Sequence, residues 1–130
     1  MRILMYYDGT DDTREALPNV KQRATAMNAK VYVMSSFSRW GDVDTKMIEE
    51  RENGLNYIKS VLEKENVPCE THLLMVKDHN PGDDILDIAS KYQVDEIIIG
   101  TDRKSNIEKF IPGWLVNHVI SRAKCPVLIV

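Results

Sequence analysis

Five short runs of apolar residues recur along this sequence, and the segments between them carry apolar residues at helical spacing. The runs are ILMYY, VYVMSSF, CETHLLMV, DEIIIG and PVLIV, at residues 3–7, 31–37, 69–76, 95–100 and 126–130. A largely unbroken apolar run is typical of a strand covered on both faces, as in a parallel sheet. We therefore expect an α/β domain with a doubly wound sheet of five parallel strands and helices on both faces.

The first intervening segment predicts a helix that begins near Asp12. Asp12 and Glu15 have the spacing of a capping box. Pro18 falls past the first turn of such a helix, where its ring removes a hydrogen bond and favours a kink. The expected buried face consists of Leu17, Val20, Ala24 and Met27.

Three further helices are expected, at about 45–65, 81–92 and 114–123. Asn80 followed by Pro81 is typical of a helix start, with an N-cap and a proline at the first helical position. Gly54 is an unusual residue for the interior of a helix. The expected buried faces are Ile48, Leu55, Ile58 and Leu62, then Ile85, Ile88, Ala89 and Tyr92, then Val116, Val119, Ile120 and Ala123.

Length and charge exclude several classes of protein. The 130 residues fit one domain, spanning 1–130. The net charge is −3, with both signs interleaved, so the sequence offers no basic face for nucleic acid or an anionic membrane. No apolar run approaches the ~20 residues of a membrane span, and the N-terminus lacks a signal peptide's apolar core. We expect a cytoplasmic protein.

The loops that follow the first, second and fourth strands contain the candidate site residues. In doubly wound sheets, ligands bind beyond the carboxyl ends of the strands, where the winding reverses. Gly100 lets the backbone turn and a ligand approach closely. Gly113 opens a helix whose free N–H groups and dipole favour an anion. A turn or a cap explains each glycine alone, and their joint placement around one crevice is what indicates a site.

The stretch IGTDRKSNIEKFIPGW, residues 99–114, and its surroundings resemble the universal stress protein family. Members end in a G-x2-G-x9-G-[S/T] loop, a helix and a PVLVV-like strand. Here Gly100, Arg103, Gly113 and Trp114 stand at that spacing, followed by a helix and CPVLIV at 125–130. ILMYYDGTDDTREAL and NPGDDILDIA resemble two further family segments. The resemblance covers essentially the full length and implies the strand order 3-2-1-4-5 of an adenine nucleotide alpha hydrolase-like fold.

The resemblance also implies where a nucleotide would bind. In nucleotide-binding members, the first-strand aspartate and the end of the second strand hold the adenosine. The glycine loop and the following Ser/Thr hold the phosphates, often with a divalent metal. Carried over to this sequence, the residues are Asp8, with Gly9 and Thr10 in its turn, then Ser36, Phe37, Gly100, Gly113, Trp114 and Leu115. The implied ligand is ATP or AMP.

Two residues depart from the family's loop. Arg103 replaces its second glycine; a side chain there is unfavourable if positive φ is needed, although a guanidinium could reach a phosphate. Trp114 replaces a small hydroxyl residue, and an indole can neither coordinate a metal nor accept a hydrogen bond. Pointing inward, Trp114 fills the phosphate space; pointing outward, it contributes only its N–H.

The departures favour a degenerate nucleotide site. We therefore expect a homodimer with a stress-response or regulatory role, without catalysis and with no required cofactor. The alternative is an ATP- or AMP-binding regulator that uses residues 100–115, with or without slow hydrolysis. The sequence does not identify a protein partner.

The family's dimers imply how two copies would assemble. In those dimers the last strand pairs across a two-fold axis, and an apolar strand at 126–130 would otherwise leave an aggregation-prone edge. By the family's strand order, Cys69 and Cys125 lie near opposite edges of the sheet. A disulfide between them is therefore not expected.

Rival functions of the same fold class have weaker support. Asp78 imitates the phosphorylated aspartate of a response-regulator receiver, but Asp8 has no acidic neighbour at the end of the first strand, and Lys124 precedes the last strand instead of following it. Two aspartates after the first strand would repel a flavin phosphate. The sequence has neither GxGxxG after the first strand nor GxxxxGK[ST] anywhere. His72, His79 and His118 lie too far apart to indicate catalysis.

Overall fold

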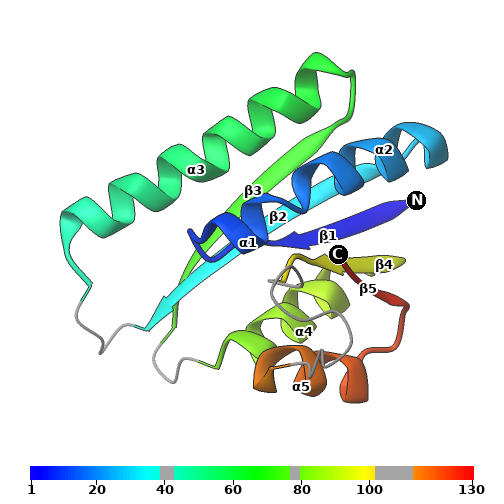
Figure 1. Ribbon diagram of the computed structural model, residues 1–130. Coiled ribbons are helices and arrows are strands. Elements are labelled where there is room, and N and C mark those ends of the chain that lie inside the picture. The colour runs from blue at the N-terminus through cyan, green and yellow to red at the C-terminus, as the bar shows by residue number, and fades with distance from the viewer. Residues whose placement is uncertain (39–42, 77–79, 102–112) are drawn as a thin grey trace.

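The computed structural model describes residues 1–38, 43–76, 80–101 and 113–130. Five strands form one parallel sheet of order β3-β2-β1-β4-β5, as expected, and helices cover both of its faces (Figure 1). The strands are β1 (Arg2–Tyr6), β2 (Lys30–Ser38), β3 (Cys69–Val76), β4 (Glu96–Ile99) and β5 (Val127–Ile129). The helices are α1 (Asp11–Arg14), α2 (Leu17–Met27), α3 (Thr45–Lys64), α4 (Pro81–Lys91) and α5 (Trp114–Arg122).

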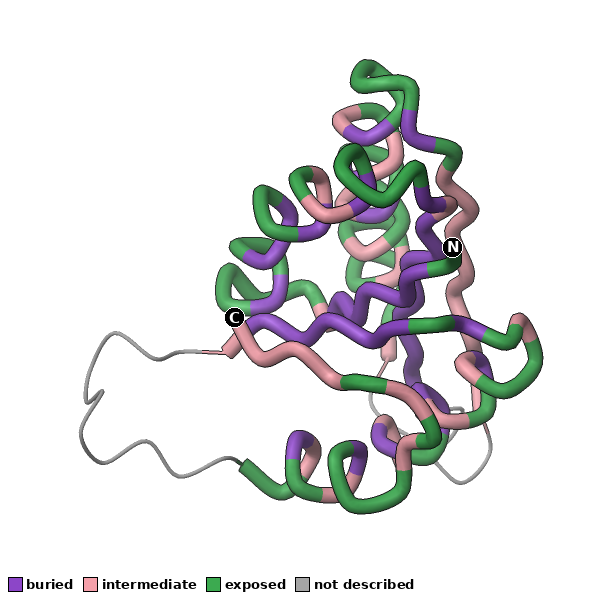
Figure 2. The backbone as a smooth tube through the Cα atoms, turned by 90° about the vertical axis from the view of Figure 1, so that its right-hand side faces the viewer, coloured by how far each residue is buried: buried purple, intermediate pink, exposed green. Residues whose placement is uncertain are grey.

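Alternate residues of the central strand β1 enter two separate cores. Ile3 and Met5 pack with residues of α2 and α3, whereas Leu4 and Tyr6 pack with residues of α4 and α5. All four side chains are buried, and the buried parts of the chain concentrate in the inner strands (Figure 2). The apolar run at the start of the sequence therefore reflects a strand with a helical layer on each side.

The first predicted helix begins within one residue of the expected start, but its capping residue and its continuity were predicted wrongly. Two helices replace it, and the N-cap is Thr10, whose hydroxyl accepts a 3.3 Å hydrogen bond from the Thr13 amide. Pro18 lies in the first turn of α2, where a missing N–H costs no helical hydrogen bond. The proline therefore starts a second helix instead of kinking a longer one.

Two predicted core residues are exposed. Met27 and Ile120 expose 50% and 48% of their surface, although the other apolar residues expected on the same faces are largely covered. Each lies in the last turn of its helix. Helical periodicity gives the direction of a face, and it does not tell where along a helix that face stops being covered.

The remaining expectations about the sheet and its caps agree with the structure. Asn80 caps α4 by accepting a 3.2 Å hydrogen bond from the amide of Asp83, with Pro81 as the first helical residue. Cys69, in β3, and Cys125, before β5, are free thiols near opposite edges of the sheet. Within the described parts of the chain, no helix is long and apolar enough to cross a membrane.

Candidate functional site

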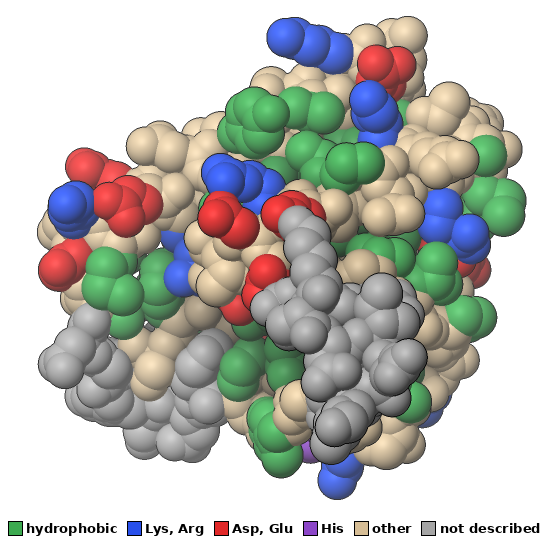
Figure 3. Space-filling view, viewed as in Figure 1, with side chains coloured by type: hydrophobic (Ala, Val, Ile, Leu, Met, Phe, Trp, Pro, Cys, Tyr) green, Lys and Arg blue, Asp and Glu red, His purple; other side chains and the backbone are tan. Residues whose placement is uncertain are grey.

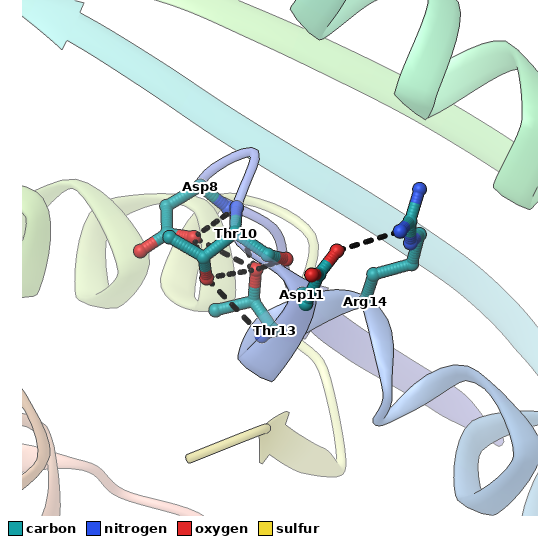
Figure 4. A network of polar contacts seen from close by, with 5 residues as sticks. All are labelled: Asp8, Thr10, Asp11, Thr13 and Arg14. Atoms are coloured by element: carbon teal, nitrogen blue, oxygen red, sulfur yellow. Dashed lines mark hydrogen bonds and ion pairs between the residues drawn. The ribbon is translucent and has the colours of Figure 1, made fainter. Parts of the chain in front are cut away.

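The turn that follows β1 fixes the carboxylate of Asp8. Its Oδ1 accepts hydrogen bonds from the Thr10 amide at 2.9 Å, the Thr10 hydroxyl at 2.5 Å and the Thr13 hydroxyl at 2.8 Å (Figure 4). Gly9 has a φ of 88°, in the left-handed region that favours glycine. The first turn of α1 thus holds Asp8 in one orientation at the carboxyl end of the central strand.

A cavity of about 320 Å³ lies between this turn, the end of β4 and the start of α5. Five of the predicted site residues line it, although they come from segments about 100 residues apart. The full lining is Asp8, Thr10, Asp12, Thr13, Ile99, Gly100, Thr101, Gly113, Leu115 and Val116. The structure therefore joins the aspartate turn and the two ends of the glycine loop around one cavity, where the winding of the sheet reverses.

Gly100 has a packing role in this cavity as well as a candidate ligand role. A Cβ atom at this position would lie 2.2 Å from the backbone carbonyl oxygen of Asp12. Only a residue without a side chain lets the first turn of α1 approach the end of β4 this closely.

The start of α5 presents backbone N–H groups without a side-chain cap. Its N-cap is Gly113, with a φ of −66°, and a Cβ atom there would meet nothing within 4 Å. Gly113, Leu115 and Val116 all line the cavity. The unsatisfied N–H groups and the positive end of the helix dipole therefore lie beside it, an arrangement that attracts anions.

Trp114 takes the outward of its two expected orientations. Its side chain is not part of the cavity lining, and the residue is 62% exposed. The indole stacks on the imidazole of His118, with ring centroids 4.8 Å apart. His118 was not linked to the loop in the sequence analysis, although it stands four residues from Trp114 on α5, a spacing at which helical side chains meet. The indole therefore does not fill the space beside the α5 amides.

Ser36 and Phe37 lie at the end of β2, as expected, but they are buried and do not line the cavity. The guanidinium of Arg51 covers this end of the sheet. It lies 4.2 Å from the centre of the Phe37 ring and donates a 2.6 Å hydrogen bond to the Ser35 hydroxyl. No sequence pattern indicated a role for Arg51, a polar residue on the long helix α3. Its contacts depend on how α3 crosses the strands.

Other predicted residues lie outside the described parts of the chain. They are Arg103, with the rest of 102–112, and also Asp78 and His79. The predicted role of Arg103 at a phosphate therefore stays a prediction.

Charge around the site agrees with the interleaved signs of the sequence. Acidic and basic side chains lie interspersed over the face seen in Figure 3. Burial raises the pKa of the Tyr6 hydroxyl, with a further contribution from Asp8, so this group below the cavity stays protonated. Among the residues the structure describes, no cluster of His, Cys, Asp or Glu could hold a metal ion.

A larger cavity, of about 410 Å³, lies at the other end of the sheet. Val94 and Cys125, which precede β4 and β5, line it together with residues of α4 and Arg122. It contains none of the predicted site residues and none of the backbone features that attract an anion at the start of α5. We therefore regard the cavity beside Asp8 as the candidate site.

The sheet order and the site at its carboxyl end define a doubly wound α/β domain of the nucleotide-binding type. The sequence model of the universal stress protein family matches residues 1–130. The chain belongs to this family.

Individual relatives agree with this assignment. Universal stress protein MJ0531 of Methanocaldococcus jannaschii is 29% identical over 140 residues, covering 99% of this chain and 81% of the relative. A universal stress protein structure from Archaeoglobus fulgidus superposes with a TM-score of 0.82 at 29% identity, covering 99% of this chain and 92% of the other. Another structure from that organism, in complex with dAMP, has a TM-score of 0.78 at 27% identity, with coverages of 99% and 96%.

Proposed function

We propose that this chain is a cytoplasmic, non-catalytic regulator of the stress response that binds AMP or ATP in the cavity beside Asp8. The observation that carries the proposal is that a fixed carboxylate and the uncapped start of α5 border the same cavity. Its volume, about 320 Å³, falls in the range of small-molecule sites. The outward orientation of Trp114 supports the nucleotide-binding alternative over a degenerate site.

The chemistry of the lining suits the two ends of a nucleotide. A carboxylate is an acceptor for sugar hydroxyls, and Asp8 is held in place by Thr10 and Thr13. The free N–H groups after Gly113 suit a phosphate. The dAMP complex of the Archaeoglobus fulgidus relative supports the same class of ligand for this chain.

The first experiment measures nucleotide binding directly. The purified protein is denatured, any released nucleotide is identified by mass spectrometry, and thermal unfolding is followed with ATP and AMP, each with and without magnesium. At about 100 times its dissociation constant, a ligand raises the free energy of unfolding by ~2.7 kcal/mol, which for a domain of this size is a shift of several degrees. No released nucleotide and no shift would overturn the proposal.

A pair of substitutions at Gly113 locates the site. Its backbone conformation suits any residue, and a side chain there has open space. Asp and Asn are both good N-caps, so both variants should keep α5 intact. Gly113→Asp places a negative charge beside the bound phosphate and should weaken binding much more than Gly113→Asn, which is the matched neutral control. Equal affinities of the two variants would place the phosphate elsewhere.

We also propose that two copies pair through β5. The Val130 amide donates to Ile99, and the carbonyl of Pro126 accepts from Ile97, so this side of β5 is bonded to β4. Val127 therefore directs its backbone N–H and C=O groups to the other side, at the edge of the sheet. A second copy would satisfy these groups and cover the apolar strand.

Light scattering after size exclusion tests the dimer. Wild type should show twice the mass of one chain. Val127→Pro, which removes an edge N–H, should shift the mass towards the monomer, while Val127→Ala, which keeps that N–H, should remain dimeric. A monomeric wild type would contradict this assembly.

A further inference from the structure

Trp114 stands next to the candidate nucleotide site without entering it. Its chain neighbours Gly113 and Leu115 both line the cavity, whereas its own side chain is 62% exposed and stacks on His118. Side-chain torsions have alternative staggered wells, so the indole has other directions available to it from this backbone position. The outward direction of the indole therefore needs a stabilising contact, and the stack on His118 provides one.

His118 is held by the first turn of α4. Its Nε2 lies 2.6 Å from Oδ1 of Asp83, and its side chain is only 11% exposed. The imidazole also lies directly on the backbone of α4, because a Cβ atom at Gly82 would be 2.5 Å from Cδ2 of His118. Asp83 itself is fixed, since its amide donates to the Asn80 side chain. The imidazole is therefore a firmly placed surface, and the indole of Trp114 lies against it at an interplanar angle of 25°.

We propose that Asp83 and His118 are positioning residues for the nucleotide site: they hold Trp114 outside the cavity and so leave the amides of α5 open to a phosphate. This inference rests on the proposed nucleotide binding. Neither residue touches the nucleotide in this arrangement; each acts through the indole. Trp114 is thus accommodated in a position where the family has a small hydroxyl residue.

A mutant cycle separates positioning from a general structural effect. Affinities for ATP and AMP are measured by calorimetry for wild type, His118→Ala, Trp114→Ser and the double variant. An aromatic stack contributes an equilibrium factor of about three- to tenfold, so His118→Ala should weaken binding by that factor. Trp114→Ser should bind at least as well as wild type. In the double variant the loss of His118 should have no further effect, because there is no indole left to misplace.

The conservative substitution Asp83→Asn provides a rescue. Asparagine keeps an oxygen that accepts from His118, so this variant should bind close to wild type, whereas Asp83→Ala should resemble His118→Ala. A merely structural role would make the effect of His118→Ala the same with Trp114 or Ser at position 114. That result would overturn the inference.

A readout without nucleotide separates the inference from the proposed function. The indole N–H resonance of Trp114, assigned by its disappearance in Trp114→Ser, should shift in His118→Ala and not in Asp83→Asn. An unchanged resonance in His118→Ala would overturn the inference even if nucleotide binds. If the resonance shifts and wild type binds neither ATP nor AMP, the proposed function fails, and with it the positioning role; His118 then only orients the indole.

Discussion

The hydroxyl of Thr13 donates a 2.8 Å hydrogen bond to the carboxylate of Asp8, five residues earlier in the chain. Thr13 is buried, and its hydroxyl also accepts from the backbone amide of Asp8 at 3.2 Å. The two residues therefore tie the end of β1 to the first turn of α1. The candidate site depends on this contact, because it fixes the carboxylate at the edge of the cavity.

Thr13→Val tests this relationship, since valine keeps the shape and removes the hydroxyl. The free energy of unfolding should fall by about 1–3 kcal/mol, because the part-buried amide of Asp8 loses its partner and the part-buried carboxylate loses one of its donors. Nucleotide affinity should fall as well. Urea denaturation measures the first effect. Thr25→Val is the matched control at an exposed position of α2, where a change within ±0.5 kcal/mol is expected; an equal loss in both variants would contradict the prediction.

A second prediction concerns the pair of Arg23 and Glu96. Glu96 is buried in β4, and its carboxylate accepts hydrogen bonds of 2.5 and 2.6 Å from Arg23, whose side chain is 34% exposed. Arg23→Met leaves this buried carboxylate without its cation, so the free energy of unfolding should fall, and by more than for an exposed ion pair.

The control for this pair is Arg14→Met. Arg14 contacts Asp11 at 2.6 Å, a similar distance, but both side chains are exposed. Solvent screens such a pair, and its loss should cost less than about 1 kcal/mol. Chemical denaturation of the two variants compares them directly. Similar losses of unfolding free energy in Arg23→Met and Arg14→Met would show that the burial of Glu96 does not strengthen its ion pair with Arg23.

We expect Gly54→Ala to destabilise the protein, although alanine has the higher helix propensity. Replacing a glycine in a helix by alanine ordinarily stabilises the helix by about 1 kcal/mol. Here a Cβ atom would lie 2.1 Å from the hydroxyl oxygen of Tyr7, which is buried in the core. Gly54→Ala should therefore lower the free energy of unfolding by about 1–3 kcal/mol through overpacking.

Tyr7→Phe supplies the rescue for Gly54→Ala. The phenylalanine ring lacks the hydroxyl, the atom nearest to the new methyl group, but keeps two ring carbons at 2.6 and 2.7 Å, so the double variant should recover only part of the loss. Asn53→Ala, at the exposed neighbouring position of α3, should be close to neutral. A stabilised Gly54→Ala variant would contradict the packing seen here.

The two thiols should be slow to react and should affect stability at high pH. Burial raises the pKa of Cys69 from 9.0 to about 12. Burial, aided by Asp95 and Glu96, also raises the pKa of Cys125. Both should therefore react slowly with a thiol reagent at pH 8, because the thiolate is the nucleophile. Unfolding in denaturant should restore fast labelling of both.

The raised pKa of Cys69 also predicts how the stability of the protein changes with pH. The folded state prefers the neutral Cys69 thiol, so its stabilising contribution is complete below pH 9 and is lost as the pH rises towards about 12. Cys69→Ala should show a shallower loss of stability over this alkaline range than wild type. Parallel curves for the two proteins would contradict the assigned shift.

Much of the fold follows from local features of the sequence. The apolar runs predict the strands because a strand with helices on both faces has no polar side. Asn80 and Pro81 predict the start of α4 because capping chemistry acts over a few residues. The N-cap of α1 was missed because several polar residues in the DGTDDT stretch can cap a helix. Which of them does so depends on the turn that Asp8 makes with Thr10 and Thr13.

The sequence by itself determined the fold class and the loops that carry the site, since glycines, caps and apolar runs have local physical consequences. Only the tertiary structure decided the direction of Trp114, the burial of Phe37 beneath Arg51 and the approach of Asp12 to Gly100. The first depends on the contact of His118 with Asp83 of α4, the second on the path of α3 over β2, and the third on segments far apart in the chain. Contacts of that kind depend on how helices pack across the sheet, and residue spacing alone does not encode them.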